Sequence, residues 1–411
     1  MGYQGVHLAG IRKTNQKQLK IQKSLVNVVG LGYIGWPTAL MMAEKGIEVV
    51  GTDCDPAVVA RLKAQQHDIY VSTTCQQAEF YMIAVPTPYD PLSKKVNPQY
   101  VIAAVEDVLE VCPQGAVIII ESTLSPGTIE QSVKPVITAK GKQLGRDVNL
   151  AHAPERMMPG RTREELTCNN RVIGADERVV GERVKALYAR FCQGEIIVTD
   201  IKTAEMTKVA ENTYRAVNIA FANELSRICR EAEMDVYEVI RLANMHPRVN
   251  ILQPGPGVGG HCIPVDPWFL VGDHPEQTDL IRTAMETNDS QPTHILHRIQ
   301  KVMAQEGIQD MSRVGLYGLT YKENVDDFRG SPSLKLLQQK QTSAMKSYDP
   351  FLEHLSIADN QYQDFEQFLE QVDLVVIMVR HNHIRQHWMQ LKEKVILDCW
   401  HICPLAGAYY I

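Results

Sequence analysis

The chain has 411 residues, which is enough for two or three domains with separate cores. Its composition is that of an ordinary globular protein, with 45% hydrophobic and 22% charged residues, and its formal net charge of -6 gives no reason to expect a nucleic acid or an anionic membrane surface as a partner. No apolar run reaches the roughly 18 residues of a membrane-spanning segment.

The N-terminal residues 1–24 carry several lysines and arginines, no acid and no continuous apolar stretch, so we expect a solvated extension rather than a signal peptide. The nine cysteines of the chain form no C-x-x-C pair. An odd number of scattered cysteines argues against a disulfide framework and against a zinc site. We therefore expect reduced thiols in a cytoplasmic protein, without a metal.

Residues 25–55 have the pattern of a strand, a glycine turn, a helix and a second strand. The first apolar run ends at the turn G-L-G-Y-I-G, and the second strand ends at an aspartate. The glycines let a pyrophosphate approach a helix N-terminus, while the acid can bond both ribose hydroxyls and repels a 2′-phosphate. The pattern predicts that NAD, rather than NADP, is bound by Gly30, Gly32, Tyr33, Ile34, Gly35 and Asp53.

Further short apolar runs, separated by helix-length segments, follow at 80–86, 116–123, 148–155 and 195–200. Runs of this kind are typical of a parallel sheet covered by helices, and we place the domain at residues 25–200. Ligands bind at the carboxyl ends of such strands. The candidates there, each of which could also be a simple turn residue, are Pro86, Thr87, Thr123 and Glu155.

About thirty residues without glycine or proline follow Asp200, a suitable helix N-cap. This length predicts one long helix that bridges domains or forms a subunit interface. Lys208 and Asn212 are four residues apart and share a face of this helix. A lone helical lysine is usually solvated, but one placed directly after the nucleotide domain can stabilise an oxyanion, and the asparagine can position it or a water.

Residues 255–267, G-P-G-V-G-G-H-C-I-P-V-D-P, surround one cysteine with glycines and prolines. Glycines allow positive φ and close approach of a ligand, while prolines fix φ and remove donors. Such a stiff, open loop either brings the sulfur of Cys262 against a substrate or forms a tight connection around a buried cysteine. The loop by itself leaves both interpretations open.

A second alternating pattern has apolar runs at 312–322, 343–350, 372–379 and 394–399, in the order of the first domain but without a visible sequence repeat. The predicted fold is α/β, with two Rossmann-like doubly wound domains joined by a central helical region that contains the long helix. The central region spans residues 201–300 and includes the cysteine loop, and the second nucleotide-type domain spans 301–411.

Several motifs together resemble the UDP-glucose/GDP-mannose dehydrogenase family. They are G-L-G-Y-I-G, A-V-P-T-P, E-S-T, P-E-R-M-M-P-G, T-A-E-M-T-K-V-A-E-N, the cysteine loop and G-L-T-Y-K-E-N-V-D-D-F-R-G-S-P, spread from about Val26 to about residue 400. The resemblance implies an enzyme that uses NAD to oxidise the primary alcohol of a UDP-sugar twice, to a carboxylate. Cys262 would be the nucleophile, because hydride can leave a thiohemiacetal but not a bare aldehyde carbon.

The resemblance also implies roles for matching positions. Lys208 and Asn212 would stabilise the oxyanion, Asp266 and Thr123 would assist proton transfer, and Glu155 would line the thioester site. Arg329 would reach the NAD pyrophosphate, Lys322 would hold the sugar or the diphosphate, and Arg248 would enter the site of a neighbouring subunit. The implied substrate contacts are Glu155, Arg156, Lys208, Asn212, Arg248, Gly259, His261 and Lys322. Arg248 and the apolar long helix together predict a homodimer or a higher even oligomer.

Local differences indicate the sugar. Pro159 stands where UDP-glucose dehydrogenases commonly have a glutamate, and His261 precedes the cysteine; both features resemble the N-acetylhexosamine branch. The segment before Cys262 is more similar to enzymes acting on UDP-N-acetyl-D-mannosamine than to those acting on UDP-N-acetylglucosamine. We expect oxidation of the mannosamine sugar for bacterial surface polysaccharide, with UDP-N-acetylglucosamine and UDP-glucose as alternatives.

The sequence leaves two alternative functions to weigh, and it differs from the family in one segment. A 3-hydroxyacid or 6-phosphogluconate type dehydrogenase shares the glycine turn and K-x-x-x-N, but needs neither the cysteine loop nor a second nucleotide-type domain. Loss of Cys262 or Lys208 would favour a non-catalytic nucleotide-sugar sensor, and both residues are present. The departure is a shortened connection between Asp55 and the run at 80–86, without the family's acidic E-P segment near the cofactor.

Overall fold

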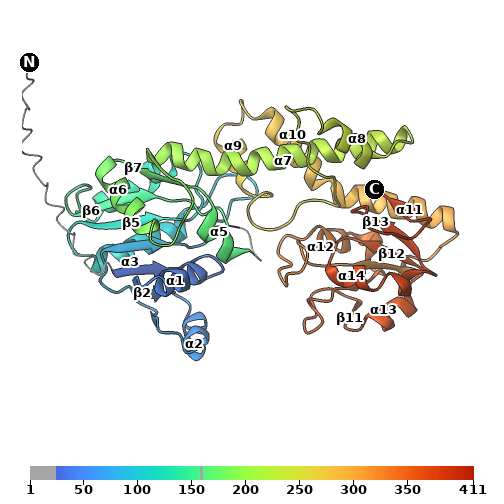
Figure 1. Ribbon diagram of the computed structural model, residues 1–411, viewed down its shortest axis with the longest axis horizontal. Helices are drawn as coiled ribbons and strands as arrows, with labels where there is room; N and C mark the ends of the chain where they lie inside the picture. Colours follow the sequence, from blue (N-terminus) through green and yellow to red (C-terminus); the bar gives the residue numbers. More distant parts are fainter. Residues whose placement is uncertain (1–24, 158–160) are drawn as a thin grey trace, which may run out of the picture.

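The structure, a computed structural model, describes residues 25–157 and 161–411. The predicted extension at residues 1–24 and the predicted sugar-determining Pro159 lie outside the described residues. Two sheet domains lie side by side, and the helix α7 (Ile201–Glu231) runs across the top of both (Figure 1). The predicted α/β fold, with two doubly wound domains and one long helix, is confirmed.

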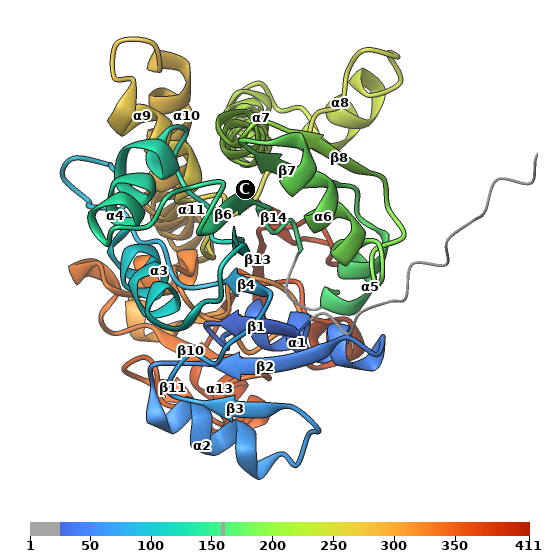
Figure 2. The same ribbon diagram turned by 90° about the vertical axis from the view of Figure 1, so that its left-hand side faces the viewer.

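The first domain is an eight-stranded sheet in the order β3-β2-β1-β4-β5-β6-β7-β8. Its central strands form because runs such as Ala116–Ile120 are apolar on both faces, and helices cover both faces (Figure 2). The strands are β1 (Leu25–Val29), β2 (Glu48–Thr52), β3 (Tyr70–Ser72), β4 (Phe80–Ile83), β5 (Ala116–Ile120), β6 (Val148–His152), β7 (Arg171–Ala175) and β8 (Ile196–Thr199). The helices are α1 (Gly35–Glu44), α2 (Pro56–Ala64), α3 (Gln99–Val111), the π-helix Ile129–Val133 that continues into α4 (Lys134–Ala139), α5 (Thr162–Cys168) and α6 (Arg178–Tyr188).

This sheet differs from the predicted parallel sheet because β7 and the predicted strand β8 run opposite to the other strands. β7, which the sequence analysis did not identify, pairs antiparallel with β6 through Ala151↔Ala175 and His152↔Gly174. The chain leaves β6 at the carboxyl edge, forms α5, and enters β7 from that same edge, so β7 runs back against β6. The other strand pairs of this sheet are parallel, and the crevice between the carboxyl ends of β1 and β4 is where a doubly wound sheet binds its ligand.

The central region consists of helices that pack along α7. Asp200 caps α7 as predicted, since its carboxylate accepts a hydrogen bond from the Thr203 backbone N–H at 2.8 Å. One side of α7 is buried against the first domain, α9 and α10, whereas the other exposes Tyr214, Phe221 and Ile228, spaced seven residues apart. The remaining helices are α8 (Val236–Ala243), α9 (Asp266–Asp273), α10 (Asp279–Asp289) and α11 (Gln291–Glu306).

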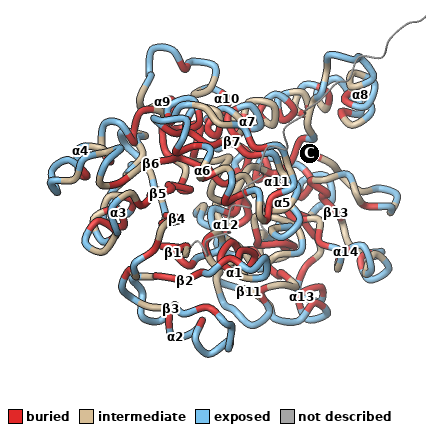
Figure 3. The backbone as a smooth tube through the Cα atoms, turned by 60° about the vertical axis from the view of Figure 1, so that its left-hand side comes forward, coloured by how far each residue is buried: buried red, intermediate tan, exposed pale blue. Residues whose placement is uncertain are grey.

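The second domain is a six-stranded sheet in the order β11-β10-β9-β12-β13-β14, and its neighbouring strands are parallel. Apolar residues of α11 pack against this sheet, and Figure 3 shows that buried residues concentrate in the two sheets and the helices against them. The strands are β9 (Val314–Tyr317), β10 (Lys346–Tyr348), β11 (Gln361–Tyr362), β12 (Leu374–Ile377), β13 (Val395–Asp398) and β14 (Tyr409–Tyr410). The helices are α12 (Pro332–Leu337), α13 (Phe365–Gln371), α14 (Asn382–Gln386) and the short 3-10 helices Met311–Arg313, Lys340–Thr342 and Trp388–Leu391. Within the described residues, no helix has the length and apolar character needed to cross a membrane.

Candidate active site

The glycine turn after β1 has the shape that a pyrophosphate requires. Gly30 has φ +90°, and a Cβ there would lie 2.6 Å from the Ala84 carbonyl oxygen at the end of β4. A Cβ at Gly35 would overlap the carbonyl oxygen of Gly30, so this glycine lets α1 start close to the strand. A Cβ at Gly32 would meet nothing within 4 Å. Gly32 therefore leaves the open approach to the backbone that a dinucleotide phosphate needs.

The acid predicted to bind ribose lies beside this turn. Asp53 follows β2, and its two carboxylate oxygens accept hydrogen bonds from the backbone N–H groups of Leu31 at 2.8 Å and Asp55 at 2.9 Å. Each oxygen keeps a second acceptor position, so the ribose hydroxyls can still bind. The residues of the turn and Asp53 thus fit NAD.

Other predicted residues lie at the carboxyl ends of β4 and β5. Pro86 is exposed, whereas Thr87 and Thr123 are half-buried. The hydroxyl of Ser122 donates to the carbonyl of Val85 at 2.7 Å, which joins the two loops. The structure therefore brings these residues together at one edge of the sheet.

A buried polar cluster links α7 to the start of α9. Lys208, Asn212 and Asp266 are 7%, 5% and 3% exposed, and the amide of Asn212 donates to the Asp266 carboxylate at 2.6 Å. Lys208 is therefore not the solvated helical lysine of the alternative interpretation. Burial raises the pKa of Asp266 to about 6, against the opposing effects of Lys208 and the Asn212 hydrogen bond. A carboxyl group with this pKa can exchange a proton near neutral pH.

Cys262 belongs to the same cluster. Its carbonyl accepts hydrogen bonds from the backbone N–H groups of Val265 at 3.1 Å and Asp266 at 2.8 Å, so it lies one turn before α9. Burial and the Asp266 charge raise the pKa of the thiol, while Lys208 and Arg215 lower it. The cysteine is thus partly buried and lies among groups that act on its charge, and its role as a nucleophile stays a prediction.

Two residues near the thiol were missed by the sequence analysis. Arg215 lies seven residues after Lys208 and three after Asn212 on α7, a spacing that puts all three on one face and could have revealed it. Tyr321 packs across the cysteine loop: a Cβ at Gly259 would lie 2.6 Å from the Tyr321 Cβ. The four residues G-L-T-Y in the second domain match G-L-G-Y in the first, which is the signal that could have revealed this tyrosine.

The cysteine loop lies between α7 and the second domain, beneath α7 in Figure 1. A Cβ at Gly255 would approach the ring of Trp400 to 3.0 Å, and Gly257, at φ +131°, packs on Pro332. The Gly260 backbone N–H donates to the carbonyl of Arg329 at 3.1 Å. The glycines of this loop therefore permit close packing on the second domain.

Residues of the two domains meet beside this loop. The Arg329 guanidinium carbon lies 5.2 Å from the ring centroid of Tyr33, and its nitrogens donate to the Asp327 carboxylate at 2.8 and 2.6 Å. The His261 ring lies 5.8 Å from that of Tyr33. Its Nε2 is buried, 3.9 Å from Asp327, and is without a hydrogen-bond partner among the described residues. Burial and Arg329 lower the pKa of His261, which favours a neutral ring.

The remaining predicted residues have other surroundings. Glu155 is buried, and its oxygens accept hydrogen bonds from two backbone N–H groups of its own loop and from Arg171 at 2.9 Å. Arg156 forms an ion pair with Glu211 on α7. Arg248 is exposed in the loop after α8, and Lys322 is half-buried in the turn after β9. Glu155 and Arg156 are thus engaged within the protein, and their roles toward a substrate stay predictions.

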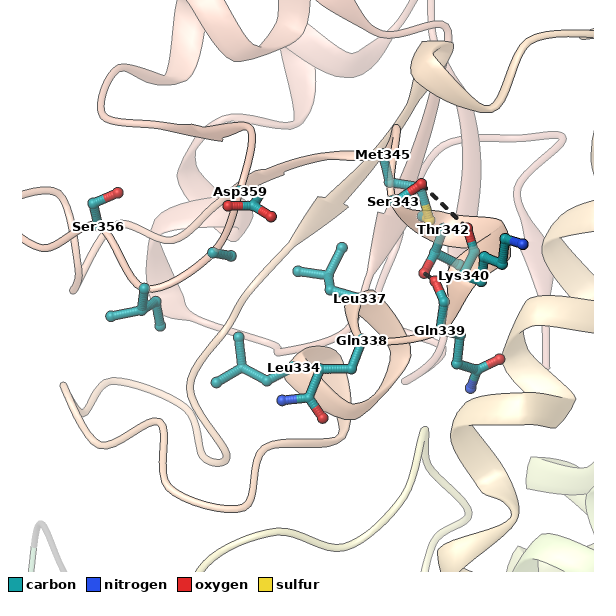
Figure 4. Close-up of a pocket in the computed structure, with 12 residues that line it drawn as sticks. Leu334, Leu337, Gln338, Gln339, Lys340, Thr342, Ser343, Met345, Ser356 and Asp359 are labelled. Carbon is teal, nitrogen blue, oxygen red and sulfur yellow. Dashed lines mark hydrogen bonds between the residues drawn. The ribbon is translucent and has the colours of Figure 1, made fainter.

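A hollow of about 540 Å³ on the second domain is separate from this site. It is formed by α12, the 3-10 helix after it and residues 356–359, and none of the predicted site residues lines it (Figure 4).

Comparison with protein families agrees with this geometry. The family described as UDP-glucose/GDP-mannose dehydrogenase matches in three parts: its NAD binding domain at residues 24–73 and 71–192, its central domain at 202–290 and its UDP binding domain at 315–404. The chain belongs to this family. The NAD binding domain matches in two pieces that meet at residues 71–73, inside the shortened connection.

Known proteins align with nearly the whole chain. UDP-N-acetyl-D-mannosamine dehydrogenase of Methanocaldococcus jannaschii is 39% identical over 401 residues, which cover 90% of this chain and 91% of the relative. NDP-N-acetyl-D-galactosaminuronic acid dehydrogenase of Ralstonia nicotianae is 38% identical over 413 residues, which cover 93% and 97%. The solved UDP-D-ManNAc dehydrogenase of Pyrococcus horikoshii superposes with a TM-score of 0.86 at 34% identity, over 94% of this chain and 98% of that one.

Proposed function

We propose that this protein oxidises the C6 hydroxymethyl group of UDP-N-acetyl-D-mannosamine with NAD to UDP-N-acetyl-D-mannosaminuronate. The observation that carries the proposal is the position of Cys262 beside Lys208 and Asp266, with its loop packed on the UDP binding domain. The names of the relatives from Methanocaldococcus jannaschii and Pyrococcus horikoshii support the sugar.

In the first oxidation, the alcohol loses a hydride and a proton and becomes an aldehyde. NAD, held at the glycine turn, would supply the hydride acceptor, one molecule for each of the two oxidations. The Lys208 ammonium group stabilises the alkoxide that forms, and Asn212 orients the groups around it. Asp266, with its pKa near 6, and Thr123 assist the transfer of the hydroxyl proton.

The second oxidation requires the thiol. The Cys262 thiolate adds to the aldehyde carbon and forms a thiohemiacetal, whose oxyanion Lys208 and Asn212 stabilise. Loss of a second hydride from that carbon leaves a thioester. Water then attacks the acyl carbon, the C–S bond breaks, and the carboxylate and the thiol are released. Asp266 and Thr123 position this water, and Glu155 fixes the adjoining loop.

Local cations bind the UDP group, because the chain as a whole is negative and does not attract a dianion by net charge. We assign the diphosphate to Lys322 and the NAD pyrophosphate to Arg329. The buried Nε2 of His261, which has no hydrogen-bond partner among the described residues, supplies a hydrogen-bonding position for the acetamido side of the sugar pocket.

The oligomer is part of the proposal. Tyr214, Phe221 and Ile228 form an exposed apolar stripe along α7, and Arg248 is exposed near its end. We assign the stripe to a homodimer interface and Arg248 to the partner's substrate site. The free thiols of all nine cysteines, which lie within the described residues, are compatible with a cytoplasmic enzyme.

The test is a panel of UDP-sugars assayed for NADH release. UDP-N-acetyl-D-mannosamine should be preferred over UDP-glucose by a large factor, roughly 10⁴ in favourable cases, because a site built for the acetamido group rejects analogues that lack it. Discrimination against UDP-N-acetylglucosamine should be weaker. UDP-N-acetylgalactosamine belongs in the panel because of the Ralstonia relative. Comparable kcat/KM for UDP-glucose would overturn the sugar assignment and leave the cysteine chemistry intact.

A further inference from the structure

The second domain contains a structural copy of the NAD-binding turn. Gly318 follows β9 with φ +95°, as Gly30 follows β1 with φ +90°. The Gly318 N–H donates to the carbonyl of Tyr348 at the end of β10, and the Gly30 N–H donates to Thr52 at the end of β2, both at 2.8 Å.

Asp349, which follows β10, corresponds to Asp53, which follows β2. Asp349 accepts a hydrogen bond from the Leu319 N–H at 2.6 Å, as Asp53 accepts one from Leu31 at 2.8 Å. The two turns are therefore equivalent in backbone and in hydrogen bonding.

The second turn is closed where the first is open. Thr320 occupies the position of Gly32, and its side chain is fully buried. Its hydroxyl donates to the carbonyl of Lys322 at 2.9 Å and lies 3.3 Å from the His381 Nε2. Asp349, the counterpart of the ribose-binding Asp53, is within 3.2 Å of the same Nε2. The space that a phosphate and a ribose would use in the first domain is thus filled by protein groups in the second.

His381 is hydrogen-bonded to this closed turn on the side away from the cysteine loop. Its ring is fully buried, and Nδ1 accepts a hydrogen bond from the Asn324 backbone N–H at 2.9 Å. Nδ1 consequently carries no proton, and Nε2 donates to Asp349. The Asn324 side chain accepts a hydrogen bond from the Asn382 N–H at 2.9 Å, and Asn324 has φ +57°, a conformation that few residues adopt unaided. Two hydrogen bonds of Asn324, one from its backbone N–H and one to its side chain, thus join the turn at residues 320–324 to the start of α14.

The opposite side of the same turn contacts the cysteine loop through Tyr321. Tyr321 lies against Gly259 and Gly260, so closely that a Cβ at Gly260 would be 2.9 Å from the tyrosine ring. Lys322, assigned above to the diphosphate, is the next residue. A shift of the turn would therefore move both the loop that carries Cys262 and the cation at the UDP group.

We propose that His381 is a positioning residue, which fixes the closed turn and through it the Cys262 loop and Lys322. The proposal rests on the assignment of Lys322 to the UDP group and of Cys262 to the thioester. A displacement of about 1 Å in such groups costs on the order of 100-fold in rate. His381 acts without touching the substrate itself.

The test compares three variants of the full chain. His381→Leu removes both ring hydrogen bonds and should lower kcat/KM for the UDP-sugar roughly 10- to 100-fold, with a smaller effect on the KM for NAD. His381→Asn places an oxygen near the Nδ1 position, keeps the bond to Asn324, and should recover most of the loss. His383→Leu is the matched control, because His383 is half-buried near His381 and contacts Tyr317 rather than the turn.

The outcomes separate this inference from the proposed function. Unchanged kinetics in a folded His381→Leu variant, an equal loss in His381→Asn, or an equal loss in His383→Leu would each overturn the inference. If His381→Leu does not fold, His381→Gln replaces it: its amide can take the Nε2 position beside Asp349 but cannot accept from the Asn324 N–H, so the KM for the UDP-sugar should rise severalfold, and an unchanged KM would overturn the inference. If the wild type oxidises no UDP-sugar, the proposed function fails. UDP binding by calorimetry and the alkylation rate of Cys262, followed by mass spectrometry, then decide the inference without turnover: both should change in His381→Leu, and neither in His383→Leu.

Discussion

Cys262 has surroundings that oppose its own ionisation. Burial and the neighbouring Asp266 carboxylate raise the pKa of the thiol, and Lys208 and Arg215 offset only part of this effect. The thiol is therefore mostly protonated at neutral pH, which limits side reactions such as oxidation. In the proposed mechanism, Lys208 stabilises the oxyanion that forms when the thiolate adds to the aldehyde, an interaction that exists only during the reaction.

At the residue scale, replacing the nucleophile should separate the two oxidations. The wild type should release two NADH per sugar without free aldehyde. Cys262→Ser should slow steady-state turnover by at least roughly 10³-fold and stall after the first oxidation. NADH and product should be quantified together by absorbance and mass spectrometry. Cys112→Ser, at a half-buried cysteine after α3, is the control, and full four-electron turnover by Cys262→Ser would exclude the thiol from the mechanism.

Helix α7 contributes residues both to the candidate active site and to the packing of the first domain. Beside Lys208 and Asn212, Glu205 on the same buried side accepts hydrogen bonds from the backbone N–H groups of Gly127 at 2.5 Å and Ile129 at 2.9 Å. It therefore caps the helix that follows the loop carrying Thr123. Burial raises the pKa of Glu205 to about 7, against the opposing effect of these hydrogen bonds.

This cap gives a prediction about stability and pH. The folded-state pKa of Glu205, about 7, lies above the unfolded value of about 4.5, so its contribution is complete below pH 4.5 and is lost as pH rises through 7. The wild type should therefore lose stability between pH 5 and pH 8, whereas Glu205→Gln does not titrate there. The unfolding free energy of the variant minus that of the wild type should rise by about 1–3 kcal/mol from pH 5 to pH 8. Thermal unfolding at both pH values measures the effect. Glu130→Gln, at an exposed glutamate of the capped helix, is the control; an equal difference at both pH values would contradict the assignment.

The exposed side of α7 gives the second prediction at this scale. Phe221, 48% exposed, lies at the middle of the apolar stripe, and a charge there would be buried without a partner in a dimer. Phe221→Asp should raise the dissociation constant of the dimer at least roughly tenfold. Leu92→Asp changes an apolar residue that is 95% exposed in the first domain and should leave the constant unchanged. Light scattering over a dilution series decides, and a monomeric wild type would refute the interface.

In the whole molecule, the candidate site lies between two domains that have similar folds but differ in the turn after the first strand of each sheet. The first turn is open at Gly32, as dinucleotide binding requires, whereas the second is filled by Thr320 and lies against the cysteine loop. Arg329 crosses between them, since it belongs to the UDP binding domain and lies over Tyr33 of the NAD binding domain.

This crossing predicts that a residue of the UDP binding domain controls cofactor affinity. Arg329→Ala should raise the KM for NAD roughly 10- to 100-fold, as expected for loss of a charge-assisted hydrogen bond to a phosphate, with a smaller effect on the KM for the UDP-sugar. Arg385→Ala, at an exposed arginine on α14 of the same domain, is the control. A larger effect of Arg329→Ala on the UDP-sugar would assign the guanidinium to the substrate instead.

The sequence by itself determined the two alternating domains, the long helix with its Asp200 cap, and the glycine turn with Asp53. Each depends on local pattern: apolar runs of strand length, a stretch without glycine or proline, or glycines at fixed spacing. Short or irregular elements were missed, because β3, β11 and β14 have two or three residues and show no period.

Only the tertiary structure decided the state of Cys262, Glu155 and the second turn. The Asn212–Asp266 hydrogen bond joins residues 54 positions apart, and His381 reaches Asn324 across 57 positions. Likewise, β7 became antiparallel because of where the chain crossed the sheet edge. Burial, the charges around a thiol and the partner of a carboxylate depend on which distant segments fold against one another, so local sequence pattern does not determine them.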